Sequence, residues 1–430
     1  MSASASAPRI VVTGTGAICA AGMSPDEILD VVRSGRTAIG PVNRWDTTGW
    51  PARDAGEVRD FNPRALIEDR KLHKLIRRTD FFGLYAAGRA IDASGMLAHR
   101  ETLDAAAAAI HSDRTGVYVG SGAGSYENMY EYFPLLTEAH GDLPTFGREL
   151  ANTVNPMWLL RTLPNNVLGH IGIKYALKGP NACITSHSVG GTLAVIEATE
   201  ALRNGEADRT VAVAHDTPIE PQLVLYYHEL GLLAQTSLRP FDARHDGSLF
   251  GEGAGALVLE TEASAASRNA PVLGEVLGGG YACEAEGLVS IRDDGDGVAR
   301  AIALALDDAQ LRAADVGMIV AHGNGTPQSD VTEAAAIRRL FGADGQAPPV
   351  TAFKWAFGHL IAAAGIVDTV LALALLKQRE VPGIATLAEL DPDCAGLRVS
   401  AQPQTPRSDV ALILCRGFAG TNAALLVRAA

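Results

Sequence analysis

Short stretches with the composition of β-strands alternate with stretches of helical periodicity along almost the whole chain. Apolar runs typical of strands lie at 9–22, 115–122, 210–216, 255–260, 317–323 and 410–415. Helical patterns separate them at 26–35, 192–205, 297–311 and 332–342. This alternation predicts an α/β fold in which helices pack on sheets. The chain has 430 residues, 47% of them hydrophobic, so it can bury a large core.

The overall composition argues against several classes of protein. A formal net charge of −13 argues against general binding to nucleic acid. No CxxC pair occurs, so we expect a reducing, cytoplasmic location and no metal site; the five cysteines are Cys19, Cys183, Cys283, Cys394 and Cys415. The first ten residues, MSASASAPRI, lack the basic and apolar regions of a signal peptide. The longest apolar run, 361–376, is interrupted by Asp368 and is too short to span a membrane.

Two glycine-containing turns raise specific functional possibilities. The first, GTGAIC at 14–19, follows a strand, but Cys19 occupies the third glycine position of a dinucleotide-binding turn, so we expect no cofactor. The second, SHSVGG at 186–191, resembles the G-x-S-x-G turn of serine hydrolases, with Ser186 in place of the first glycine and Ser188 at the nucleophile position. No HGG-type oxyanion loop precedes it. A serine hydrolase is therefore a minor alternative.

Three further side chains occupy glycine-rich junctions between strands and helices. His322 follows an apolar strand in IVAHGNGTPQSD, and Lys354 and His359 lie in TAFKWAFGHLIAAAG. Any one of them alone would more often be a satisfied buried histidine or a solvated lysine. Together with the hydroxyl of Ser188 they predict a catalytic site. Histidines can donate hydrogen bonds to a developing oxyanion or act as a general base, and a nearby cation tunes their pKa values.

Five motifs in this order resemble those of the elongating β-ketoacyl-acyl-carrier-protein synthases, or ketosynthases, which are the condensing enzymes of fatty-acid and type II polyketide synthesis. They are VVTGTGAICAAG, RPFDARHDGSLFGEGAGALVLE, AHGNGTPQSDVTEA, KWAFGHLIAAAG and GFAGTN, and they span nearly the whole chain. The resemblance implies a thiolase fold, with two similar βαβ halves that form a layered α-β-α-β-α sandwich, and a dimer. We expect residues 1–262 to carry the nucleophile position and 263–430 to carry the histidines and the lysine.

The resemblance also implies catalysis by a cysteine and two histidines. The cysteine takes an acyl chain from the phosphopantetheine arm of an acyl carrier protein, and the histidines assist decarboxylation of a malonyl unit and stabilise the enolate and the oxyanion. Carried over, the histidines are His322 and His359, the family lysine is Lys354, and Glu333 is its expected ion-pair partner. The gating aromatic is Phe418, and the backbone N–H groups of residues 188 and 418 would form the oxyanion hole.

The nucleophile is where the chain departs from this family. Ser188 occupies the cysteine position, whereas Cys183 lies five residues earlier on the predicted strand and is out of register. A helix N-terminus contributes about 0.3–1 kcal/mol, at most roughly 2 kcal/mol, and one pKa unit corresponds to about 1.4 kcal/mol. The helix can therefore help to ionise a thiol but not an alcohol. Ser188 needs a base, and we expect His322 or His359 to take its proton.

Three interpretations of Ser188 follow. In the first, it is an altered nucleophile that serves acyl transfer or a modified C–C or ester-forming step. In the second, the chain is a catalytically silent partner of a separate ketosynthase, similar to a chain-length factor, whose C-terminal motif resembles LCRGFAGTN here. In the third, the serine replaces the natural cysteine of a condensing enzyme. The retained His322, Lys354 and His359 favour an acyltransferase, acting as a homodimer or as a heterodimer with a ketosynthase.

A basic cluster, RKLHKLIRRTD at 70–80, stands out on this acidic chain. A solvated helix face or a dimer rim would explain it without a function. Because carrier proteins are acidic, opposite charge would also steer one to this cluster. We therefore predict carrier-protein docking at Arg70, Lys71, Lys74, Arg77 and Arg78.

Overall fold

The computed structural model describes residues 8–60, 62–122, 129–130, 132–342 and 347–430. Most of the N-terminal stretch compared above with signal peptides lies outside these residues. Within them, ten strands form one mixed sheet in the order β10-β9-β11-β12-β8-β1-β7-β6-β4-β5. All six predicted strands are confirmed, because each lies on β1, β4, β6, β7, β9 or β11.

The same strand order occurs twice in this sheet. The first half runs β5 (Asn181–Ile184), β4 (Thr115–Ser121), β6 (Arg209–Asp216), β7 (Gly253–Thr261) and β1 (Ile10–Cys19). The second half runs β10 (Val350–Thr351), β9 (Met318–Val320), β11 (Val410–Gly417), β12 (Thr421–Ala429) and β8 (Gly274–Cys283). The halves meet where residues 10–12 of β1 pair antiparallel with 274–276 of β8. We infer two repeated halves joined between β7 and β8, and the expected boundary after residue 262 falls within this connection.

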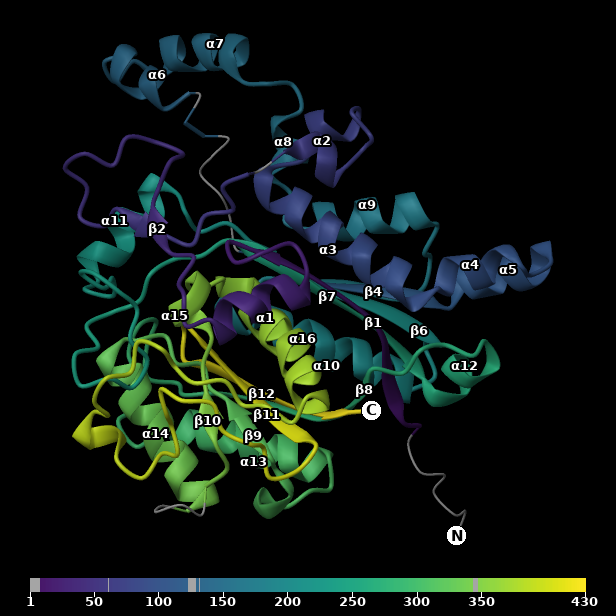
Figure 1. Ribbon diagram of the computed structural model, residues 1–430. Coiled ribbons are helices and arrows are strands. Elements are labelled where there is room, and N and C mark those ends of the chain that lie inside the picture. The colour runs from purple at the N-terminus through teal and green to yellow at the C-terminus, as the bar shows by residue number, and fades with distance from the viewer. Residues whose placement is uncertain (1–7, 61, 123–128, 131, 343–346) are drawn as a thin grey trace.

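Helices cover the sheet in layers (Figure 1). On the first half, α3 (Arg78–Ser94) and α9 (Asn166–Tyr175) form the outer layer. Between the halves lie α10 (Gly190–Arg203) and α16 (Ala364–Lys377). On the second half α13 (Asp296–Asp308) packs on the sheet, and α14 (Pro327–Phe341) packs beside α13. The expected α-β-α-β-α sandwich is therefore confirmed. The other α-helices are α1 (Pro25–Arg33), α2 (Pro63–Leu66), α4 (Met96–Glu101), α5 (Ala105–Asp113), α6 (Phe133–Glu138), α7 (Leu143–Thr153), α8 (Trp158–Thr162), α11 (Pro221–Glu229), α12 (Glu262–Ser267) and α15 (Lys354–Phe357).

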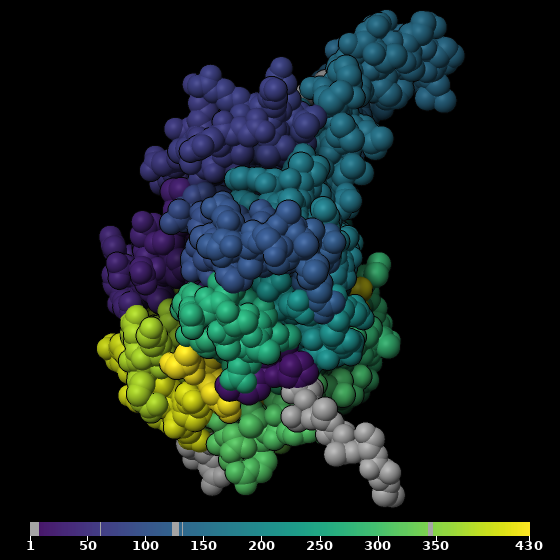
Figure 2. All heavy atoms as spheres, turned by 90° about the vertical axis from the view of Figure 1, so that its right-hand side faces the viewer, coloured from purple at the N-terminus to yellow at the C-terminus, as the bar shows by residue number. Residues whose placement is uncertain are grey.

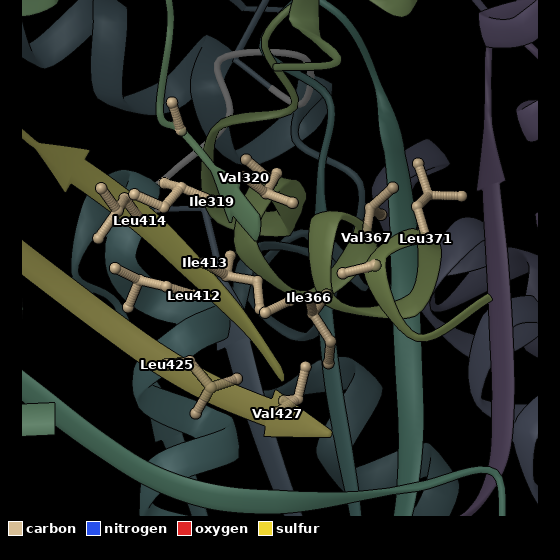
Figure 3. Close-up of a cluster of buried hydrophobic side chains, with 14 of the residues drawn as sticks. Ile319, Val320, Ile366, Val367, Leu371, Leu412, Ile413, Leu414, Leu425 and Val427 are labelled. Carbon is tan, nitrogen blue, oxygen red and sulfur yellow. The ribbon is translucent and has the colours of Figure 1, made fainter. Parts of the chain in front are cut away.

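The central helix α16 is apolar on nearly every side because both halves of the sheet pack on it. Figure 3 shows its side chains Ile366, Val367 and Leu371 near apolar residues of β9, β11 and β12. A helix that is hydrophobic all round is stable only when it is buried on all sides. Asp368 is the acidic exception and is itself buried.

An arm made of α6, α7 and α8 extends away from the body of the molecule (Figures 1 and 2). It exposes large apolar side chains, notably Leu143 at 76% and Leu159 at 62%. Exposed apolar residues mark a contact with another molecule where they form a contiguous patch, whereas single ones are common on protein surfaces. Among the described residues, no helix is both long enough and apolar enough to cross a bilayer.

Candidate active site

Ser188 lies at the junction between β5 and α10, inside the short 3₁₀ turn His187–Val189. Its side chain is fully buried. The start of α10 packs directly on β4, where a Cβ on Gly120 would lie 2.5 Å from the carbonyl carbon of Gly190. This close approach fixes the turn that carries Ser188. Cys183 lies on β5 and directs its thiol to the carbonyl oxygen of Pro164 at 3.4 Å, away from the turn.

His322 and His359 meet beside Ser188, as the separate motifs predicted. His322 follows β9, His359 precedes the first turn of α16, and their ring centroids are 5.1 Å apart. The Nε2 atom of His359 lies 3.1 Å from Ser188 Oγ. Burial, reinforced by the charge of Lys354, lowers the pKa of both histidines well below the usual value, so both rings are neutral at pH 7.

Backbone hydrogen bonds fix the tautomers of these two rings. The N–H of Ile361 donates to His359 Nδ1 at 3.2 Å, and the N–H of Arg416 donates to His322 Nδ1 at 3.3 Å. A ring nitrogen that accepts a hydrogen bond carries no proton, so the proton of each neutral ring is on Nε2. Both histidines therefore present N–H donors, which suit them to bind an oxyanion rather than to accept a proton.

The ammonium of Lys354 lies behind His322 and is fully buried. It donates to the carbonyl oxygen of His322 at 2.5 Å and lies 3.6 Å from the carboxylate of Asp368. The expected pairing of Lys354 with Glu333 is wrong, because the carboxylate of Glu333 instead accepts the backbone N–H groups of His322 and Gly323 at 2.7 and 3.0 Å. Glu333 thus supports the site by holding the histidine turn.

Burial makes both carboxylates harder to ionise. It raises the pKa of Asp368 to about 6 and that of Glu333 to about 7. Sequence reasoning missed Asp368 as a site residue. The signal was available, since an acidic residue inside an otherwise apolar buried helix requires a cationic or hydrogen-bonding partner.

A stack of aromatic rings covers Ser188. Phe418, in the turn between β11 and β12, stacks on His187 with centroids 4.5 Å apart and planes 16° from parallel. His187 Nε2 lies 2.7 Å from the hydroxyl of Tyr227 on α11. The N–H of Phe418 donates to His187 Nδ1 at 3.3 Å, although we expected it in the oxyanion hole. Neither His187 nor Tyr227 was predicted as a site residue.

These side chains open into one cavity of about 310 Å³. Its lining brings together the residues from four separate motifs: Ser188, His322, His359 and Phe418, with His187 and Tyr227 beside them. The remaining wall includes the apolar Leu288, Val289 and Ile291. A buried hydroxyl, two N–H-donating imidazoles and an apolar wall suit the binding of an acyl group by its carbonyl oxygen and its hydrocarbon chain.

The basic cluster separates into two parts. Arg70, Lys71 and Lys74 are exposed. Arg77 is buried near Asp80, and Arg78 forms a two-pronged ion pair with the buried Glu252 at 2.5 and 2.8 Å. The last two guanidinium groups therefore stabilise the fold, and the predicted docking surface is reduced to the three exposed residues.

Comparison with known proteins agrees with this arrangement. The models of the β-ketoacyl synthase N-terminal and C-terminal domains match residues 7–265 and 273–388. The chain is 30% identical to 3-oxoacyl-[acyl-carrier-protein] synthase 2 of Synechocystis sp. over 423 residues, covering 97% of each chain.

Solved structures show the same fold. The ishigamide ketosynthase/chain length factor superposes with a TM-score of 0.87 at 28% identity, covering 99% of this chain and 100% of that chain. A type II PKS acyl-carrier protein in complex with its ketosynthase superposes with a TM-score of 0.81 at 25% identity, covering 98% and 99%. The chain belongs to the β-ketoacyl synthase family.

Proposed function

We propose that the chain is an acyltransferase of this family, in which Ser188 accepts an acyl group from the phosphopantetheine thioester of an acyl carrier protein. The observation that carries the proposal is the position of Ser188 Oγ, 3.1 Å from His359 Nε2 in a cavity that also contains His322. A subunit without chemistry has no need for two buried, oriented histidines and a buried lysine. The Synechocystis relative is named for an acyl carrier protein, and the second structural neighbour is a ketosynthase in complex with one.

Acyl transfer fits the serine better than condensation does. An alcohol can receive an acyl group from a thioester when a base takes its proton. The resulting oxoester is a poorer acyl donor to an enolate than a thioester is. We therefore expect slow C–C bond formation and place the main activity in the transfer of the acyl group to Ser188 and onward to another acceptor.

Intact mass measurement tests this proposal. After incubation with an acyl carrier protein that bears an acyl thioester, we expect the chain to gain the mass of one acyl group. Ser188→Ala should abolish this gain, whereas Cys183→Ala, which removes the half-buried thiol on the neighbouring strand, should not. A gain that persists in Ser188→Ala, or no gain in the unchanged chain, would contradict the proposal.

We further propose that the carrier protein docks at Arg70, Lys71 and Lys74. Lys71→Glu/Lys74→Glu should raise the KM for the acyl carrier protein several-fold at low salt, because opposite charges attract over about 10 Å at 0.1 M salt. The effect should shrink at high salt. The exposed pair Lys178→Glu/Lys377→Glu makes the same charge change elsewhere and should leave the KM unaltered. Equal KM values for the two double variants would show that Arg70, Lys71 and Lys74 do not form the docking site for the carrier protein.

A silent partner subunit is the second candidate function. It is favoured by the exposed apolar arm, by the serine at the cysteine position, and by a structural neighbour whose name includes a chain length factor. In that case the chain should form a heterodimer when mixed with a ketosynthase of the same source, measured by light scattering, and only the ketosynthase should become acylated. A homodimer that acylates itself would exclude this candidate.

A further inference from the structure

We propose that His187 is the general base for Ser188. In this proposal His187, rather than His322 or His359, takes the hydroxyl proton during acyl transfer, and Tyr227 positions the imidazole. The inference rests on the proposed function, since it concerns the activation of the same serine. It replaces our expectation that one of the two motif histidines accepts the proton.

The hydrogen bonds of Ser188 determine where its proton points. Ser188 Oγ has two imidazole neighbours, His359 Nε2 at 3.1 Å and His187 Nδ1 at 3.0 Å. His359 Nε2 carries a proton, because its Nδ1 accepts the N–H of Ile361, so it donates to Oγ. The hydroxyl has one proton of its own, and the remaining acceptor is His187 Nδ1.

The other contacts of His187 leave its Nδ1 free of a proton. The N–H of Phe418 also points at Nδ1, at 3.3 Å, so the neutral ring carries its proton on Nε2 and donates to Tyr227 Oη at 2.7 Å. Burial raises the pKa of Tyr227, so its phenol stays protonated. The order hydroxyl, imidazole, orienting oxygen is the arrangement that activates serine nucleophiles in other folds.

The backbone is distorted to allow this contact. His187 has φ = 45°, in the left-handed region that non-glycine residues rarely adopt. In an extended chain, neighbouring side chains point to opposite sides. The left-handed turn at 187 instead brings its ring and the hydroxyl of Ser188 together, and stacking on Phe418 holds the ring there. Such a conformation costs about 1–3 kcal/mol, which the surrounding packing must offset.

The proposed step balances in atoms and charge. Ser188 Oγ attacks the thioester carbonyl carbon while its proton moves to His187 Nδ1. The carbon–sulfur bond then breaks, and the proton passes from Nδ1 to the leaving thiolate, which gives acyl-Ser188 and the free thiol of the carrier protein. While Nδ1 is protonated it cannot accept the N–H of Phe418, so that amide becomes available to the oxyanion. The change of partner accounts for the position of Phe418 in the resting site.

The electrostatic surroundings keep His187 ready to accept a proton. Burial lowers its pKa to about 4. Among the described residues, its titratable neighbours Tyr227, His322 and His359 are neutral at pH 7. Asp216 acts electrostatically on Tyr227, and burial raises the pKa of this carboxyl to about 7. The imidazole is therefore unprotonated throughout the range from pH 5 to 8. General bases usually contribute about 10²–10⁴-fold to a rate, and we expect the lower end because the described partner of His187 Nε2 is the neutral phenol of Tyr227 rather than a carboxylate.

An alkyl fluorophosphonate provides a test that does not depend on the carrier protein, since it reacts with base-activated serines. We expect it to modify Ser188. His187→Asn should lower the rate of this modification at least about 100-fold, because asparagine can accept the hydrogen bond of the hydroxyl but cannot take up its proton. The exposed His228→Asn is the matched control and should react at the original rate. Tyr227→Phe should be about 10-fold slower, and the exposed Tyr226→Phe should be unchanged. The rate of the unchanged chain should be flat from pH 5 to 8.

The outcomes separate this inference from the proposed function. Labelling of His187→Asn at the original rate, or no labelling of Ser188 in the unchanged chain, would overturn the role of His187. Labelling that depends on His187 without acylation from the carrier protein would support the base and contradict the acyltransferase. Adding Ser188→Cys to His187→Asn should restore acylation, because a thiol ionises without a strong base. If this double variant stays inactive although Ser188→Cys alone reacts, His187 has a structural role and the inference fails.

Discussion

Ser188→Cys is expected to accelerate acylation by an acyl carrier protein at least about 100-fold at pH 8 and to introduce C–C bond formation with a malonyl thioester. An ordinary thiol has a pKa of about 8.5, so about a quarter of it is already thiolate at pH 8. The helix N-terminus at α10 and the Nε2–H of His359 both favour the anion at this position. The thioester formed would also be a better acyl donor than the present oxoester.

Burial opposes this ionisation, and the site must overcome it. The buried Cys415 shows the size of this effect, since burial raises its pKa to about 12 even though Lys354 and Thr192 act in the opposite direction. At position 188 the Nε2–H of His359 replaces part of the lost solvent. We therefore expect the acylation rate of Ser188→Cys to rise with pH between 6 and 9, whereas the rate of the unchanged chain stays flat.

The measurement is a time course of intact mass at several pH values, followed by analysis of the small-molecule product. Ser186→Cys, which places the thiol two residues earlier, is the matched control. It should neither accelerate acylation nor form a β-ketoacyl product. A β-ketoacyl product from Ser188→Cys would indicate that the histidines and Lys354 still form a condensing site, as expected if the serine replaces a natural cysteine. Fast acylation without condensation would restrict the chain to acyl transfer.

Local patterns predicted the fold and part of the site because they reflect local physics. Strand and helix periodicities located the elements, and glycine-rich junctions located Ser188, His322, Lys354 and His359. Tyr227 has no motif and lies 40 residues from His187, so only the packing of α11 brings the two together. His187 was overlooked because alternation along an extended chain would have placed it on the opposite side from Ser188.

Two of the corrections have clear physical causes. The sequence suggested that Glu333 forms an ion pair with Lys354. In the structure, the carboxylate of Glu333 instead accepts hydrogen bonds from the backbone N–H groups of the turn after β9. Arg78 looks like a surface cation, yet it begins α3 and faces Glu252, a residue 174 positions away. Charge patterns in a sequence show which groups need partners, whereas the fold determines which partner each one finds.

Arg416→Met is expected to lower the free energy of unfolding by about 3–5 kcal/mol, the usual loss when one member of a buried ion pair is removed. Arg416 is only 5% exposed. Its guanidinium binds Glu284 Oε1 at 2.5 Å, Thr332 Oγ1 at 2.6 Å and Asn422 Oδ1 at 3.2 Å. It thereby ties β11 to α14 and to the segment after β8, and its removal leaves the buried carboxylate of Glu284 without a cation.

Urea unfolding of matched variants measures this contribution. Arg428→Met is the control, because Arg428 is 37% exposed and lies 3.6 Å from Glu275, and it should cost less than about 1 kcal/mol. Arg416→Met/Glu284→Gln should recover most of the stability, since no unpaired charge remains. If Arg416→Met lowers the free energy of unfolding by less than about 1 kcal/mol, water or a local rearrangement must stabilise the charge of Glu284 in place of the arginine. A loss of about 3–5 kcal/mol would mean that the arginine of LCRG is explained by its buried ion pair and hydrogen bonds. The motif would then be no evidence that the chain is catalytically silent.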